Sequence, residues 1–146
     1  MTPTRSTELY QRRVRLTREA AAAAEARGQV RAAIRDWEIP VDVDIAVLLT
    51  SDLATNAITF GDGETFTLAI RCSRSHLRID VYVKSNSRPG GVDEPDDTQA
   101  GRGLVLVTAL STEWGAFRTP AGQAIYFSLA GQPDRPSDGV RATAGN

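Results

Sequence analysis

A carboxylate and a carboxamide lie one helical turn apart in the apolar stretch LLTSDLATNAITFG, residues 48–61. An advance of about 100° per residue places Asp52 and Asn56 in the middle of the helical stripe that carries Leu49 and Leu53. A buried carboxylate without partners is costly or becomes protonated, and an asparagine can form up to four hydrogen bonds. Either the pair is satisfied within the fold, for example by an arginine, or the stripe forms the floor of a pocket and the pair binds a ligand.

A second candidate site is the turn AGRGL, in which Gly101 and Gly103 precede an apolar segment. The free N–H groups and the dipole at a helix N-terminus attract anions, above all phosphate, and glycine lets a ligand approach the backbone closely. Arg102, between the two glycines, is either a phosphate ligand or a solvated loop residue. The turn therefore strengthens the ligand interpretation of the polar pair.

The segment 86–100, before this turn, is rich in proline, glycine and acidic residues and has no periodicity. Long loops inside a compact domain are usually functional or mobile, and such a loop can close over a ligand. Its four acids would repel a triphosphate if they faced it, whereas a run of charges more often faces water. We expect a lid.

Hydrophobic periodicity predicts the surrounding elements. A short edge strand is expected in 12–19, and helices are expected over 20–37, 43–59 and from about 104. Antiparallel hairpins are expected at 65–72 with 76–85, and at 113–119 with 122–130. Helices gathered on one face of a mostly antiparallel sheet give an α+β sandwich.

The domain organisation follows from length and composition. A chain of 146 residues has the usual size of one domain. Residues 1–11 are polar and expected to be flexible, 12–130 form the domain, and the Pro-, Asp- and Gly-rich tail 131–146 is expected to be disordered.

Composition excludes several classes of function. The net charge of −1 does not fit a direct nucleic-acid binder. We see no apolar run of membrane-spanning length and no signal peptide, so the expected location is the cytoplasm. A single cysteine, Cys72, excludes a disulfide framework, and it is expected to be a small buried hydrophobe. His76 is the single histidine and is expected to be exposed in a turn, so a Ser-His-Asp triad would have to use it.

Several motifs in this order resemble the histidine kinase-like (GHKL) ATPase superfamily, and within it the bacterial anti-sigma-factor serine/threonine kinases. They are DLATNA at 52–57, VYVKSNS at 81–87, the turn at 101–104 and GQAIYFSL at 122–129. The resemblance covers about residues 12–130. It implies the Bergerat ATP-binding fold, a two-layer α/β sandwich with a mixed, mostly antiparallel sheet and helices on one face, and it implies ATP and Mg²⁺ as cofactors.

The resemblance also implies roles for individual residues. Asn56 would coordinate Mg²⁺ between the nucleotide phosphates, and Asp52, where the family has Glu, would be the general base. The family's adenine-binding Asp corresponds to Ser85, or to Asn86 in a register shifted by one residue, and Ser85 can bond adenine directly or through water. The remaining nucleotide contacts would come from Gly101, Arg102, Gly103 and Leu104.

Two functions from different classes remain open. In the first, the protein is a kinase that phosphorylates an anti-anti-sigma (STAS-type) protein and sequesters a sigma factor, and it is a homodimer. In the second, nucleotide binding is weakened or lost and the protein acts through protein contacts alone. Asn56 and the glycines favour the first function, while the shorter Asp52 and the missing adenine-binding Asp favour the second. A third function, the ATPase half of a two-component kinase, is disfavoured because His76 lacks a dimerisation-helix context.

Overall fold

The computed structural model describes residues 10–84 and 104–131 of the chain. Its elements are, in order, β1 (Tyr10–Thr17), α1 (Ala21–Trp37), α2 (Val43–Phe60), β2 (Asp62–Cys72), β3 (His76–Lys84), α5 (Val105–Leu110), β4 (Glu113–Thr119) and β5 (Gly122–Ala130). This order confirms the elements expected from periodicity, including the helix after the glycine turn and both hairpins.

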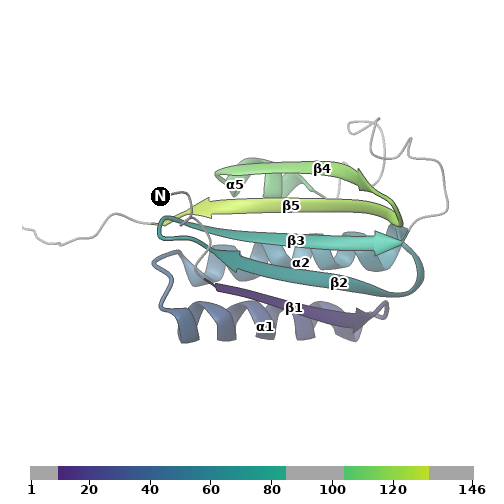
Figure 1. Ribbon diagram of the computed structural model, residues 1–146, viewed down its shortest axis with the longest axis horizontal. Helices are drawn as coiled ribbons and strands as arrows, with labels where there is room; N and C mark the ends of the chain where they lie inside the picture. Colours follow the sequence, from purple (N-terminus) through teal and green to yellow (C-terminus); the bar gives the residue numbers. More distant parts are fainter. Residues whose placement is uncertain (1–9, 85–103, 132–146) are drawn as a thin grey trace, which may run out of the picture.

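The five strands form one sheet in the order β1-β2-β3-β5-β4, and every neighbouring pair of described strands is antiparallel. The prediction of a mixed sheet is therefore wrong, because no two neighbouring described strands are parallel. Tight turns join β2 to β3 and β4 to β5, which makes each of those pairs antiparallel. Figure 1 shows the described helices on one side of this sheet, so the protein is a two-layer α+β fold in which no described helix covers the second sheet face.

Alternation along the strands separates the two faces of the sheet. The helix-facing side chains of β2, β3 and β5 are apolar and buried, and they include Phe66, Leu68, Ile70, Leu77, Ile79, Val81, Phe127 and Leu129. Against them pack Ala26 and Val30 of α1, and Leu49 and Leu53 of α2. Full burial of a side chain of the Leu or Phe class contributes about 1.5–3 kcal/mol, so this layer holds the helices against the sheet.

Local chemistry fixes the ends of both long helices. Helix α1 ends at Glu38, whose φ of 53° is left-handed and whose N–H bonds back to the carbonyls of Ile34 and Arg35. Helix α2 begins at Asp42, whose carboxylate accepts the Ile45 N–H at 3.1 Å. Helix α2 ends at Gly61, whose N–H donates to the Ala57 carbonyl and whose extended backbone leads directly into β2.

The N-terminal boundary of the domain lies slightly earlier than expected. Strand β1 begins at Tyr10, inside the region 1–11 that was expected to be flexible. The Tyr10 ring stacks on Trp37 of α1, with ring centroids 5.3 Å apart. Aromatic stacking of this kind stabilises the pair beyond simple burial, which explains why the strand includes this residue.

The prediction that the chain has no apolar run of membrane-spanning length is wrong for helix α2. By length and composition, this 18-residue helix is the one among the described residues that is long and apolar enough to do so. In the fold it packs against α1 and the sheet, and its leucines enter the core. That environment is typical of the core helix of a soluble protein.

Candidate functional site at the margin of helix α2

The polar pair lies at the edge of the buried face of α2. Leu49 and Leu53 are buried, Asn56 is 7% exposed, and Asp52 is partly exposed. Leu48, one turn before Asp52, is 42% exposed. The expectation that the pair sits in the middle of the buried stripe is therefore wrong, because the buried face is centred on the alanines and leucines beside it.

Asp52 has no partner in the described part of the chain: its carboxylate forms no hydrogen bond and no ion pair there. Partial burial removes water from the carboxylate and raises the pKa of Asp52 above its ordinary value. The nearby arginine of α1, Arg27, donates instead to the hydroxyl of Ser51 at 3.0 Å. Pairing with an arginine, the first explanation for the buried acid, is thus not what the structure shows for Asp52.

Asn56 is almost completely buried one turn further along α2 and takes part in an interaction with the rest of the protein. A carboxamide has two donor and two acceptor positions. A hard cation such as Mg²⁺ prefers oxygen ligands and keeps several of them from water or phosphate. One carboxamide oxygen at this margin fits the part of such a site that the protein would supply.

No group of three or more histidine, cysteine, aspartate or glutamate residues suited to a metal lies within residues 10–84 and 104–131.

Leu104 lies next to α2 at the start of α5, as the N-cap residue of that helix. Its side chain is 4% exposed and belongs to the hydrophobic core with Val107. As a member of the proposed cofactor site, Leu104 can therefore offer only its backbone to a ligand. Its side chain anchors α5 beside α2, with which α5 is in contact.

The other predicted cofactor residues, Ser85, Asn86, Gly101, Arg102 and Gly103, lie outside the described residues. Strand β3 is described as far as Lys84, which is exposed and directly precedes the expected adenine-binding position. Of the predicted site residues, the structure thus describes Asp52, Asn56 and Leu104.

One buried acid, Asp80 of β3, was not selected by the sequence analysis. It is 0% exposed, yet it lies on the sheet face opposite the helices, where it pairs with Arg78. It cannot replace the missing adenine-binding Asp, because α2 lies on the other side of the sheet. The alternation of HLRIDVYV, in which Leu77, Ile79 and Val81 face the core, is the signal that places Asp80 on the second face.

The single histidine and cysteine agree with their expectations. His76 is exposed at the first position of β3, immediately after the turn, and Cys72 is buried at the end of β2. Trp37 and Trp114 pack, partly buried, against the core. None of these four residues lies on α2.

Comparison with known proteins adds no family to this geometry. A scan of protein-family models finds none that matches the chain, and a search of curated proteins finds no similar sequence.

Proposed function

We propose that the protein is a cytoplasmic ATP-binding regulator with the Bergerat fold, and that it acts as a serine/threonine kinase of the anti-sigma-factor type. The observation that carries this proposal is the half-buried, unpartnered carboxylate of Asp52, one helical turn before the buried carboxamide of Asn56. A carboxylate that loses water without gaining a partner has its charged form destabilised. Carboxylates with a pKa perturbed in this way are often found at functional sites.

The architecture supports the proposal. A two-layer fold with two long helices on one face of a sheet and a short helix beside α2 is what the resemblance leads us to expect, although all neighbouring described strands are antiparallel and the sheet is not mixed. Helix α5 is in contact with α2, the helix that carries Asp52 and Asn56.

Each residue has a distinct role in the proposed reaction. Asn56 would hold the Mg²⁺ that accompanies ATP, and the nucleotide would supply the phosphoryl group. Asp52 would accept the proton of the attacking serine or threonine hydroxyl, and the direction of its pKa shift, upward because of burial, suits a general base. Ser85 or Asn86 would bond the adenine, and Gly101, Arg102 and Gly103 would contact the phosphates.

The proposed partners follow from the same resemblance. The phosphorylated partner would be an anti-anti-sigma protein of the STAS type, and the sequestered partner would be a sigma factor. We also propose a homodimer. Sedimentation at micromolar concentration should give the mass of a dimer, and a monomer would count against this part of the proposal.

A non-catalytic binding module is the second candidate. Aspartate is one methylene shorter than the glutamate of the resembled kinases, and a displacement of about 1 Å can reduce a rate by two orders of magnitude. The loss of the adenine-binding carboxylate would also weaken discrimination between nucleotides.

Phosphoryl transfer to a candidate partner separates the two functions. Asp52→Asn should keep nucleotide binding and lose transfer, because only the base is removed. Asp52→Glu should raise the rate if reach limits it. If wild type and Asp52→Glu both bind a partner but transfer no phosphate to it, the kinase proposal fails and the binding module remains.

A further inference from the structure

Strand β4 lies at an edge of the sheet, and its outer side pairs with no described strand. It is the last strand in the order β1-β2-β3-β5-β4, and β5 is its one neighbour in the described part of the chain. Figure 1 shows β4 at the upper border of the sheet. An edge strand presents a row of backbone N–H and C=O groups that can pair with a strand of another chain.

The hairpin of β4 and β5 determines which backbone groups form this row. Thr119 lies opposite Gly122 across a two-residue turn, and such a turn joins a hydrogen-bonded pair. Bonded and non-bonded pairs alternate along antiparallel strands, so the N–H and C=O groups of Trp114, Ala116 and Arg118 point away from β5. These three residues are the ones that a further strand would bond.

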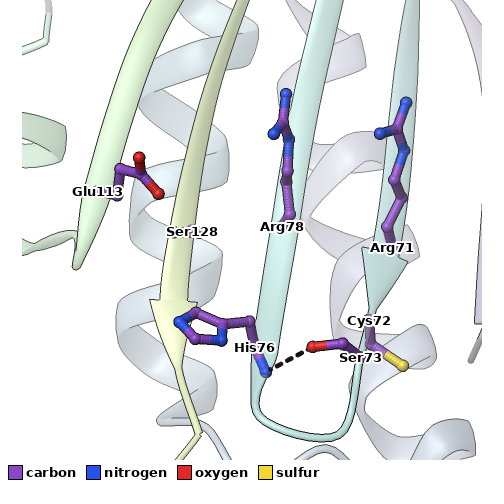
Figure 2. Close-up of a pocket in the computed structure, with 7 residues that line it drawn as sticks. All are labelled: Arg71, Cys72, Ser73, His76, Arg78, Glu113 and Ser128. Carbon is purple, nitrogen blue, oxygen red and sulfur yellow. Dashed lines mark hydrogen bonds between the residues drawn. The ribbon is translucent and has the colours of Figure 1, made fainter. Parts of the chain in front are cut away.

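The side chains of β4 alternate between the two faces of the sheet. Glu113 lies opposite Ser128, which itself lies opposite Arg78, so all three share the face that no described helix covers. Figure 2 shows Glu113 and Arg78 at a hollow on this face, with the helices behind the sheet. Gly115 and Phe117 follow Glu113 on the same face, and the three residues with outward backbone groups lie on the helix side.

The other edge of the sheet is protected against self-pairing in a way that β4 is not. Strand β1 carries Arg12, Arg13 and Arg15 among its eight residues, and like charges oppose pairing with a second copy of the same strand. Strand β4 carries one acid and one base, Glu113 and Arg118. Of the two edges, β4 is therefore the one that can accept a second copy of itself.

The sequence of β4 is complementary to itself in one antiparallel register. When Ala116 lies opposite Ala116 of the partner subunit, all outward backbone groups are bonded, in about six hydrogen bonds. Trp114 then lies opposite Arg118 of the partner subunit, and an arginine beside an indole ring is favourable. Glu113 lies opposite Thr119 of the partner subunit, so no like charges meet.

The same register covers an apolar side chain that a single copy leaves in water. Phe117 is 37% exposed, and its ring centroid lies 6.4 Å from that of Tyr126. The Tyr126 ring extends over Gly115, where a Cβ would lie 2.8 Å from it. Phe117 of the partner subunit would lie opposite Gly115, beside this ring, and aromatic pairs of this kind are stabilising. On the helix side, α5 contacts β4 and exposes Leu106 and Leu110.

We propose that β4 pairs with β4 of a second copy of this chain, antiparallel and centred on Ala116, so that one sheet runs through both copies. This inference names the interface of the homodimer proposed above and rests on that part of the proposed function. It does not depend on ATP binding or on phosphoryl transfer, because β4 carries none of the residues proposed for those steps.

Disulfide cross-linking tests the register. Directly opposed residues of a bonded antiparallel pair have Cα atoms about 5.5 Å apart, a distance that a disulfide spans. Ala116→Cys should therefore give a disulfide-linked dimer on mild oxidation. Thr119→Cys is the control, since its two copies would lie about 20 Å apart and should not cross-link. Wild type should not cross-link either, because its single cysteine, Cys72, is buried. Equal cross-linking of the two variants, or none in Ala116→Cys, would overturn the proposed register.

Sedimentation at micromolar concentration separates this interface from the homodimer itself. Ala116 is exposed, so Ala116→Glu should fold, but it would oppose two carboxylates at the centre of the interface. The dissociation constant of the dimer should rise at least about tenfold. Gln11→Glu adds the same charge to an exposed position of β1 and should change that constant less than about twofold.

The outcomes distinguish the two proposals. An unchanged dimer in Ala116→Glu would overturn the β4 interface and leave the homodimer standing, whereas a wild-type monomer would overturn both. Calorimetric titration with ATP tests the nucleotide site on α2 independently of either result.

Discussion

The guanidinium of Arg78 donates two hydrogen bonds to the carboxylate of Asp80, from Nε to Oδ1 at 2.9 Å and from Nη2 to Oδ2 at 2.8 Å. Asp80 is completely buried, although no described helix covers its face of the sheet. The hydrogen bond to Asp80 is the main cause that raises the pKa of Arg78, so the arginine stays charged at every accessible pH. Side chains of this face therefore enclose their own ion pair.

Breaking this pair from the arginine side should be costly. Arg78→Met would leave the buried Asp80 carboxylate unpaired, and such a loss lowers the free energy of unfolding by about 3–5 kcal/mol. Urea denaturation measures it. Arg13→Met is the control, since the Arg13 guanidinium also lies over a tyrosine, Tyr82, at 5.2 Å but has no carboxylate partner among the described residues. It should cost about 1 kcal/mol or less, and equal losses for the two variants would contradict this account of the pair.

The raised pKa of Asp52 predicts a pH-dependent penalty. The folded state holds the Asp52 proton more tightly than the unfolded chain, so stability falls as pH rises from the ordinary value of 3.8 through the raised folded pKa. Asp52→Asn should remove this penalty and raise the free energy of unfolding at neutral pH by about 1 kcal/mol or less, since the side chain keeps some contact with water. The gain should vanish below pH 3.8.

Urea denaturation of Asp52→Asn at pH 7 and pH 3 measures whether the free energy of unfolding rises at pH 7 and stays unchanged at pH 3. Asp44→Asn is the control, because Asp44 is an exposed acid in the first turn of α2, where the helix dipole favours a negative charge. That variant should be neutral or slightly destabilising at pH 7. A loss of stability in Asp52→Asn at pH 7 would show that the carboxylate has a stabilising partner.

Two glycines should respond in opposite ways to the same methyl group. A Cβ at Gly115 of β4 would lie 2.8 Å from the ring of Tyr126, so Gly115→Ala should destabilise by about 1–3 kcal/mol. A Cβ at Gly28, inside α1, would meet nothing within 4 Å, so Gly28→Ala should stabilise by about 0.5–1 kcal/mol through helix propensity. Thermal denaturation of both variants measures the difference, and the same sign for both would contradict the packing described here.

The sequence predicted the elements well because their periodicities are strong and local. The alternation in HLRIDVYV predicts a strand, and the i, i+3, i+4 pattern around Val30 and Ile34 predicts a helix. Strand pairing depends on long-range contacts, so the all-antiparallel sheet could not be derived from these local patterns. The position of Asp52 at the margin of α2 likewise depends on where α1 and the sheet contact the helix.

The candidate site was only partly predictable for the same reason. The spacing of Asp52 and Asn56 places them on one stripe, but exposure on that stripe is decided by neighbouring elements. Arg78 and Asp80 lie two residues apart on β3, but the ring of Tyr126 that packs on Arg78 is brought there by the register with β5. Leu104 was assigned by its motif, while its side chain is placed by core packing.

The most direct test of the central claim is a calorimetric titration of the full chain with ATP, in the presence and absence of Mg²⁺, for wild type and for Asn56→Ala. Wild type should bind ATP more tightly with Mg²⁺, and Asn56→Ala should lose that Mg²⁺-dependent gain because the metal loses its side-chain ligand. Asn56→Asp, which keeps an oxygen ligand, should retain much of the gain. If wild type binds no ATP with Mg²⁺, or if Asn56→Ala binds as wild type does, the assignment of α2 as a nucleotide site is wrong.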